Sequence, residues 1–168
     1  AYSTVDEMAR GAFNKGMKLI AITDHGPKLP GGPNVYHFGN LAIVPDELYG
    51  VRIVKGVEAN ILKNGNLDLT DEELGYLEFV AAGIHRLTGH NLNNRAEYTK
   101  ATIQAMKNPQ LDMITHPVQR EYPVDLEKVA EAAAENNVIL ELNASSYNPN
   151  KYKTRGIKSE SLKLLKLA

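Results

Sequence analysis

The sequence predicts an α/β protein with a mainly parallel β-sheet, and three features support this fold class. Short apolar runs alternate along the chain with segments of helical periodicity. Several of the helical segments open at a capping residue or stop at a glycine or asparagine. Because strand–helix–strand repeats join parallel strands by right-handed crossovers, the five apolar runs predict one sheet covered by helices.

Composition indicates a single globular domain over residues 1–168. The chain is 43% hydrophobic and 23% charged, with a formal charge of −1. This balance disfavours both disorder and a nucleic-acid backbone binder. There is no cysteine, so any metal must be held by His and carboxylate groups. No apolar run is long enough to span a membrane, and we expect a soluble, cytoplasmic protein.

The N-terminal segment begins with a capping signal. Thr4 is followed three residues later by Glu7, the spacing of a capping box, and predicts a helix over 4–15. The apolar run 19–22 predicts a strand buried on both faces of the sheet. Pro and Gly residues then predict a loop over 27–34.

The next segment is the least periodic of the chain. We expect a helix over 38–49, although Pro45 interrupts it. The run 51–60 is a stronger strand prediction. Asn64 and Gly65 lie between two apolar stretches and predict a tight hairpin turn.

The C-terminal half continues the alternation. Helices are predicted from Thr70, over 96–107, over 125–136 and over 159–168, and strands over 79–85, 111–117 and 138–143. We expect the last helix to be solvated on one face and to turn Leu162, Leu165 and Leu167 inward.

Four residues of metal-ligand type fall at the ends of separate predicted strands. His25, Glu58, His85 and His116 occupy these positions. The carboxyl ends of parallel strands meet at one edge, where α/β proteins build their sites. The pattern therefore predicts a shared site.

Each of these residues also has a structural interpretation. His25 and His116, taken singly, are typical of histidines that cap loops. Glu58 is harder to explain, because a carboxylate at the end of a buried strand is costly unless it is paired or binds a metal. His37 lies in a predicted loop from which it could reach a substrate phosphate, and His90 is expected at the surface.

The donor set suits Zn, Mn or Fe, because it consists of imidazole and carboxylate groups without sulfur. Glu58 could bridge two ions through its two oxygens. Such a centre activates a bound water and polarises a phosphoryl oxygen. The sequence therefore predicts metal-assisted hydrolysis of a phosphate ester.

Five ordered motifs resemble the PHP superfamily, named for polymerase and histidinol phosphatase, and within it the YcdX-type bacterial phosphatases. The motifs are AITDHG (21–26), KGVEAN (55–60), AAGIH (81–85), THP (115–117) and LELNASS (140–146). The resemblance runs from residue 1 to about 146. It implies a distorted seven-stranded, TIM-like (β/α) barrel with a trinuclear metal site, usually described with zinc.

The resemblance also implies roles for individual residues. Glu58, His85 and His116 would share one metal centre, and Glu58 would bridge to a second. His25 would belong to a third. The family's H-x-H motif, a His before AYST and a D-x-H element are absent, and about five of seven strands are present. We therefore expect a barrel domain truncated at both ends.

These observations predict a metal-dependent phosphatase that acts on a small phosphorylated substrate. One alternative is a catalytically silent, metal-binding fragment of such a protein, because family ligands are missing. Another is a nucleic-acid phosphodiesterase, which the charge of −1 disfavours. A homo-oligomer is left open by the sequence.

Overall fold

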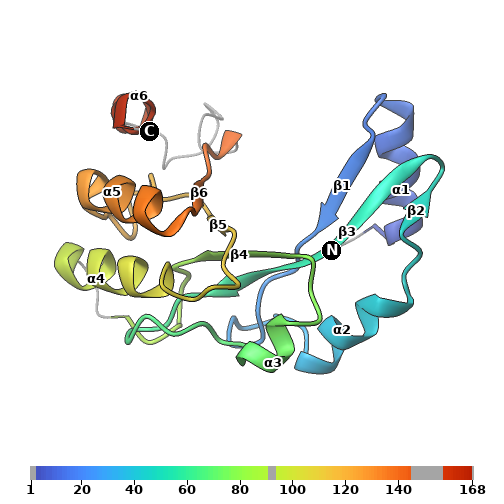
Figure 1. Ribbon diagram of the computed structural model, residues 1–168, viewed down its shortest axis with the longest axis horizontal. Helices are drawn as coiled ribbons and strands as arrows, with labels where there is room; N and C mark the ends of the chain where they lie inside the picture. Colours follow the sequence, from blue (N-terminus) through green and yellow to red (C-terminus); the bar gives the residue numbers. More distant parts are fainter. Residues whose placement is uncertain (1–2, 91–93, 145–156, 168) are drawn as a thin grey trace.

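The computed structural model describes residues 3–90, 94–144 and 157–167. Its elements in chain order are α1 (Val5–Asn14), β1 (Leu19–Ile22), α2 (Val35–Asn40), a 3₁₀ turn (Leu41–Ile43), β2 (Glu47–Leu48), β3 (Val51–Asn60), α3 (Asp71–Leu74), β4 (Phe79–Gly83), α4 (Arg95–Ala105), β5 (Met113–Ile114), α5 (Leu126–Asn136), β6 (Ile139–Leu140) and α6 (Ile157–Leu167) (Figure 1).

The sheet confirms the predicted α/β class and its mainly parallel character. Its parallel strands lie in the order β1-β3-β4-β5-β6, and β2 pairs antiparallel with β3. Parallel strands that follow one another along the chain are therefore neighbours in the sheet. In the described ranges β1 and β6 each pair along one edge only, so this sheet is open, and a PHP-type barrel stays a prediction.

The two faces of the sheet differ in what covers them. Residues such as Val57, Val80 and Ile114 point to one face and are at most 2% exposed within the core. On the other face Glu58, Ala81 and Met113 line a hollow. Since side chains alternate along a strand, burial of one face directs the remaining residues of β3 and β4 into this hollow.

Helix α1 begins where the sequence predicts. The Thr4 hydroxyl accepts a hydrogen bond from Glu7 N at 3.2 Å, and Thr4 N donates to Glu7 Oε2 at 2.7 Å. The capping box is thus complete. The following strand is only half covered, because Leu19 is 56% exposed whereas Ile22 is buried. The prediction that 19–22 is buried on both faces was wrong, since β1 lies at an edge of the described sheet.

The segment predicted as a helix over 38–49 has a different structure. Asn34 caps α2, so the helix begins at Val35 and gives way to the 3₁₀ turn before Pro45. The short strand β2 then pairs with the start of β3. The helix prediction was wrong for its second half because pairing with β3 decided the conformation.

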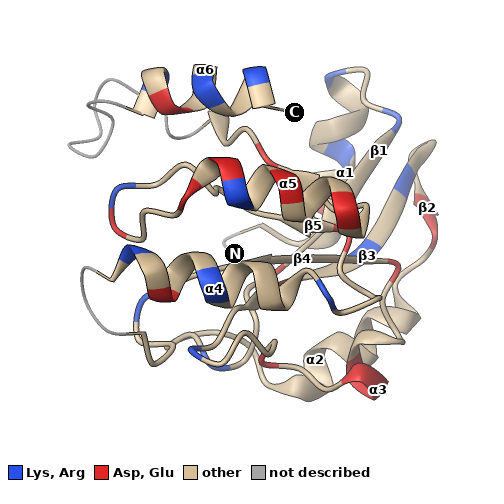
Figure 2. Cartoon of the chain, turned by 60° about the vertical axis from the view of Figure 1, so that its left-hand side comes forward, with Lys and Arg blue, Asp and Glu red and all other residues tan. Residues whose placement is uncertain are grey.

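Helices α4, α5 and α6 form a layer that lies in front of β4 and β5 (Figure 2). In α6 the buried residues are Ile157, Ser161 and Leu164. The three leucines expected to point inward, Leu162, Leu165 and Leu167, are instead 41–56% exposed. This prediction was wrong because α6 docks on α5 through the other stripe of its surface.

The remaining predicted elements are present with shorter strands. The strands expected over 111–117 and 138–143 are reduced to Met113–Ile114 and Ile139–Leu140. Asn137 ends α5 in the left-handed conformation, as its sequence position indicates. No helix in the described part of the chain is long and apolar enough to cross a membrane.

Candidate metal centre

His25 reaches the site because the chain continues to follow β3 after β1 ends. His25 and Glu58 form an isolated parallel bridge. Gly26 N donates to Glu58 O at 2.9 Å, and Glu58 N donates to Asp24 O at 3.0 Å. Backbone hydrogen bonds therefore fix the separation of the two side chains.

His116 is held at the end of β5 in an unusual backbone conformation. Its φ is 34°, in the left-handed region that costs a non-glycine residue about 1–3 kcal/mol. The Glu141 carboxylate accepts a hydrogen bond from His116 N at 2.7 Å. Gly83 on β4 leaves the space that the imidazole and Thr115 occupy. These contacts aim the His116 ring at the hollow.

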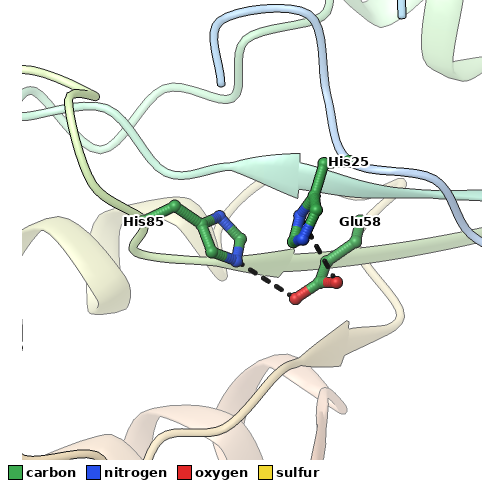
Figure 3. A group of neighbouring side chains, drawn as sticks. All are labelled: His25, Glu58 and His85. Carbon is green, nitrogen blue, oxygen red and sulfur yellow. Dashed lines mark hydrogen bonds and ion pairs between the residues drawn. The ribbon is translucent and has the colours of Figure 1, made fainter. Parts of the chain in front are cut away.

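The four predicted ligand residues come together around the Glu58 carboxylate. Oε1 lies 3.0 Å from His116 Nε2 and 3.2 Å from His85 Nε2. Oε2 lies 3.5 Å from His25 Nδ1. Figure 3 shows His25 and His85 approaching the two different oxygens. One carboxylate thus faces imidazoles on both sides.

The electrostatics of the cluster favour an ionised carboxylate beside neutral imidazole. Burial raises the pKa of Glu58, but the close contacts of its Oε1 with the rings of His116 and His85, together with the nearby His25, outweigh burial and hold the pKa well below its ordinary value. Burial lowers the pKa of His25, and the attraction of Glu58 offsets this only in part. Both shifts favour the states that bind a cation.

The cluster opens into a hollow of about 370 Å³. Its walls are Thr23, His25, Glu58, Phe79, Ala81, His85, Met113, Thr115, His116, Glu141 and Asn143. Among the described residues, neither lysine nor arginine lines it. An anionic ligand would therefore meet carboxylates and imidazoles without a permanent positive charge, unless a cation is bound there.

The residues present fit a metal ion. Ligand atoms of His25, Glu58 and His85 all lie within 4.8 Å of one another. The Nδ1 atom of His25, which lies 3.5 Å from Glu58 Oε2, is buried and has no hydrogen-bond partner within the described chain. Unpartnered imidazole nitrogens beside a carboxylate are the donor set that zinc and related divalent ions bind.

Two histidines lie elsewhere than expected. His37 is on α2 rather than in a loop, and its Nε2 lies 3.1 Å from Asp24 Oδ2. The side chain of His90 is 2% exposed rather than at the surface, with its Nε2 2.9 Å from Ile61 O. His90 was misassigned because its ring packs against Tyr98 and beside Glu97, which no local pattern indicates.

Sequence reasoning missed residues that support the cluster. Asn60 Oδ1 lies 2.8 Å from His85 Nδ1, and Glu141 holds the backbone of His116. A signal existed for each residue. Asn60 follows Glu58 by two positions and shares its strand face, and Glu141 lies near the end of the fifth predicted strand. Ser145 and Ser146, the last two residues of the LELNASS motif, lie outside the described residues.

Curated proteins similar to this chain are named as probable phosphatases. One from Acetivibrio thermocellus is 49% identical over 148 residues, which is 88% of this chain and 61% of that protein. Another from Caldanaerobacter subterraneus subsp. tengcongensis is 48% identical over 148 residues, with coverages of 88% and 58%. One from Shewanella halifaxensis is 45% identical over 149 residues, with coverages of 88% and 59%.

The chain spans about three fifths of the length of these relatives. No protein-family profile matches the chain. Over most of its own length, the chain is therefore a homologue of proteins named probable phosphatases.

Proposed function

We propose that this chain carries the metal-binding part of a phosphatase that hydrolyses a small phosphate ester, as a member of the PHP superfamily. The observation that carries the proposal is the convergence of three imidazoles on the two oxygens of Glu58, at the carboxyl ends of parallel strands. The names of the curated relatives support the phosphatase class.

The arrangement assigns distinct tasks to the residues. Glu58 places negative charge at the centre of the cluster and offers one oxygen toward His85 and His116 and the other toward His25. When bound, a divalent ion such as zinc would acidify a water and polarise a phosphoryl oxygen. Thr115 and Asn143 line the hollow, where they could orient the ester by hydrogen bonds.

The lining argues for metal dependence on electrostatic grounds. A phosphate monoester is an anion, and Glu58 and Glu141 would repel it in an empty hollow. In the described part of the lining no Lys or Arg compensates this repulsion. Bound cations would reverse the sign of the local electrostatic potential, so that the anionic substrate would be attracted instead of repelled.

A metal-loading and turnover experiment tests the proposal. The 168-residue chain is titrated with Zn²⁺ and with Mn²⁺, and the hydrolysis of p-nitrophenyl phosphate is followed. We expect binding and turnover that Glu58→Gln abolishes. The matched control is Glu127→Gln, which removes an exposed carboxylate on α5 paired with Lys163 and should change neither.

Each other outcome identifies an alternative. Metal binding without turnover would contradict hydrolysis by this chain and favour the catalytically silent metal-binding fragment. Cleavage of single-stranded DNA without release of nitrophenol would favour a nucleic-acid phosphodiesterase. Absence of Zn²⁺ and Mn²⁺ binding in the folded chain would refute the metal centre.

A further inference from the structure

A fully buried amide lies directly behind the candidate metal centre. Asn60 is 0% exposed at the end of β3. Its Oδ1 lies 2.8 Å from His85 Nδ1, and its Nδ2 donates to Asp68 Oδ2 at 2.6 Å. Both ends of the amide are therefore partnered, one by a ring of the cluster and the other by a carboxylate.

Asp68 is the common acceptor of this network. Its Oδ1 accepts from Asn60 N at 2.7 Å, and its Oδ2 also accepts from Lys28 N at 2.9 Å. Three donors thus converge on the two oxygens, which suits an ionised carboxylate. A Cβ at residue 26 would overlap the Asp68 carboxylate, so the absence of a side chain at Gly26 leaves the space that this carboxylate occupies.

The chain returns Asp68 to Asn60 through the predicted tight turn. Leu62 N donates to Asn66 O at 2.9 Å, and Ile61 pairs antiparallel with Leu67. Gly65 adopts a φ of 84°, which the turn requires. The turn thus places Asp68 where its hydrogen bonds link the loop after His25 to the end of β3, and through Asn60 to the ring of His85.

The carboxylate decides which way the amide faces. An ionised Asp68 only accepts hydrogen bonds, so the NH₂ group of Asn60 must face it and the oxygen must face His85. That oxygen in turn requires the proton of His85 to lie on Nδ1. The lone pair of Nε2 then faces Glu58 Oε1 and His116 Nε2, each 3.2 Å away. Nε2 therefore donates to neither of these atoms, and its lone pair is available to a cation bound between the three side chains.

We propose that Asp68 is a positioning residue, which through Asn60 fixes the His85 tautomer that leaves Nε2 free to bind a cation. This inference deepens the proposed function. It rests on that proposal in one respect, which is that Nε2 of His85 is a ligand atom of the metal centre. Partners behind a metal-binding histidine commonly set its tautomer and change metal affinity about 10–100-fold.

Asp68→Asn reverses the network without changing its size. The amide at residue 68 has only one oxygen that can accept a hydrogen bond. We expect this oxygen to face the buried Asn60 N–H, because the exposed Lys28 N–H can bond to water instead. Its NH₂ group then faces Asn60, whose side chain must flip to offer its oxygen. The flipped amide donates to His85 Nδ1, so the proton moves to Nε2.

The double variant Asn60→Asp/Asp68→Asn restores the original tautomer. The carboxylate at residue 60 accepts from both His85 Nδ1 and the amide at residue 68. The matched control is Asp112→Asn, because Asp112 Oδ2 also accepts from a strand amide, Val80 N at 2.8 Å, at a site outside this network.

The first readout is the tautomer itself. Long-range ¹H–¹⁵N spectra of the metal-free chain are recorded at about pH 8.5, well above the ordinary histidine pKa of about 6.5. The His85 signals are identified by their loss in His85→Gln. We expect the proton on Nδ1 in the wild type, the double variant and Asp112→Asn, and on Nε2 in Asp68→Asn.

The second readout is Zn²⁺ affinity, measured by competition with a chromophoric chelator. We expect Asp68→Asn to weaken binding about 10–100-fold, and the double variant to bind nearly as the wild type does. An unchanged tautomer in folded Asp68→Asn would overturn the inference. So would a double variant that stays as weak as the single one.

The two proposals fail in different ways. If the tautomer reverses and returns as expected while the wild type binds no Zn²⁺, the metal centre is refuted and the positioning role of Asp68 stands. If Zn²⁺ binds tightly to wild type and Asp68→Asn alike, with one tautomer in both, the positioning role is refuted and the metal centre stands.

Discussion

Gly83→Ala tests whether the space behind His116 is as tight as the structure indicates. Gly83 ends β4, opposite Asn60 on β3. A Cβ at this position would lie 2.8 Å from His116 Cε1 and 3.3 Å from His116 Nε2, and it would overlap Thr115 Oγ1. Since these neighbours are held by the sheet, they must shift to admit a methyl group.

The expected loss can be estimated from this overlap. Inserting a methyl group into a packed site costs about 1–3 kcal/mol in the free energy of unfolding. At roughly 3 °C per kcal/mol for a chain of this size, the melting temperature should fall by about 3–9 °C. The displaced His116 ring should also weaken Zn²⁺ binding by about tenfold or more, as for other disturbed ligand positions.

Thermal unfolding of the metal-free chain, followed by circular dichroism, and chelator competition measure the two effects. Gly11→Ala is the control, because Gly11 lies within α1 with no atom within 4 Å of an added Cβ. This change should stabilise the chain by about 0.5–1 kcal/mol. A Gly83→Ala variant as stable as wild type and equal in Zn²⁺ affinity would refute the packing argument.

Three further predictions concern the fold. Leu164→Ala should lower the free energy of unfolding by about 2–4 kcal/mol in urea titrations, and Leu165→Ala by less than about 0.5 kcal/mol, because only Leu164 is buried; equal losses would contradict the docking of α6. Thr4→Ala should cost about 1 kcal/mol in the same assay through loss of the cap. The free energy of unfolding of the metal-free chain should fall on acidification. The pKa of His25 is lowered in the folded chain, so below about pH 6.5 the unfolded chain takes up a proton at this residue first. The lowered pKa of Glu58 adds a further loss below about pH 4.5 for the same reason. Urea titrations between pH 7 and 4 measure this slope, and a flat profile would contradict it.

Local patterns predicted most of the element order. The capping box at Thr4, the apolar run before His25 and the left-handed end of α5 at Asn137 each depend on residues close in sequence. Where two elements compete, local patterns failed. The segment after Ile43 was misread as helix, because its pairing with the start of β3 joins residues that no local periodicity relates.

The candidate site was predictable in membership but not in detail. The carboxyl ends of parallel strands converge, so a His or Glu at four strand ends was enough to group His25, Glu58, His85 and His116. Asn60 and Asp68 carry no such mark. Their role depends on hydrogen bonds made only after a turn brings them together behind His85.

The sequence by itself determined the alternation of strands and helices and the placement of ligand-type residues at the strand ends, because both follow from periodicity and burial along the chain. Only the tertiary structure decided which stripe of α6 is buried, which oxygen of Glu58 each imidazole faces and which ring nitrogen of His85 faces Asn60. These depend on contacts such as that between Glu58 and His116, which are 58 residues apart. Such contacts form only when the crossovers bring separate strand ends to one edge of the sheet.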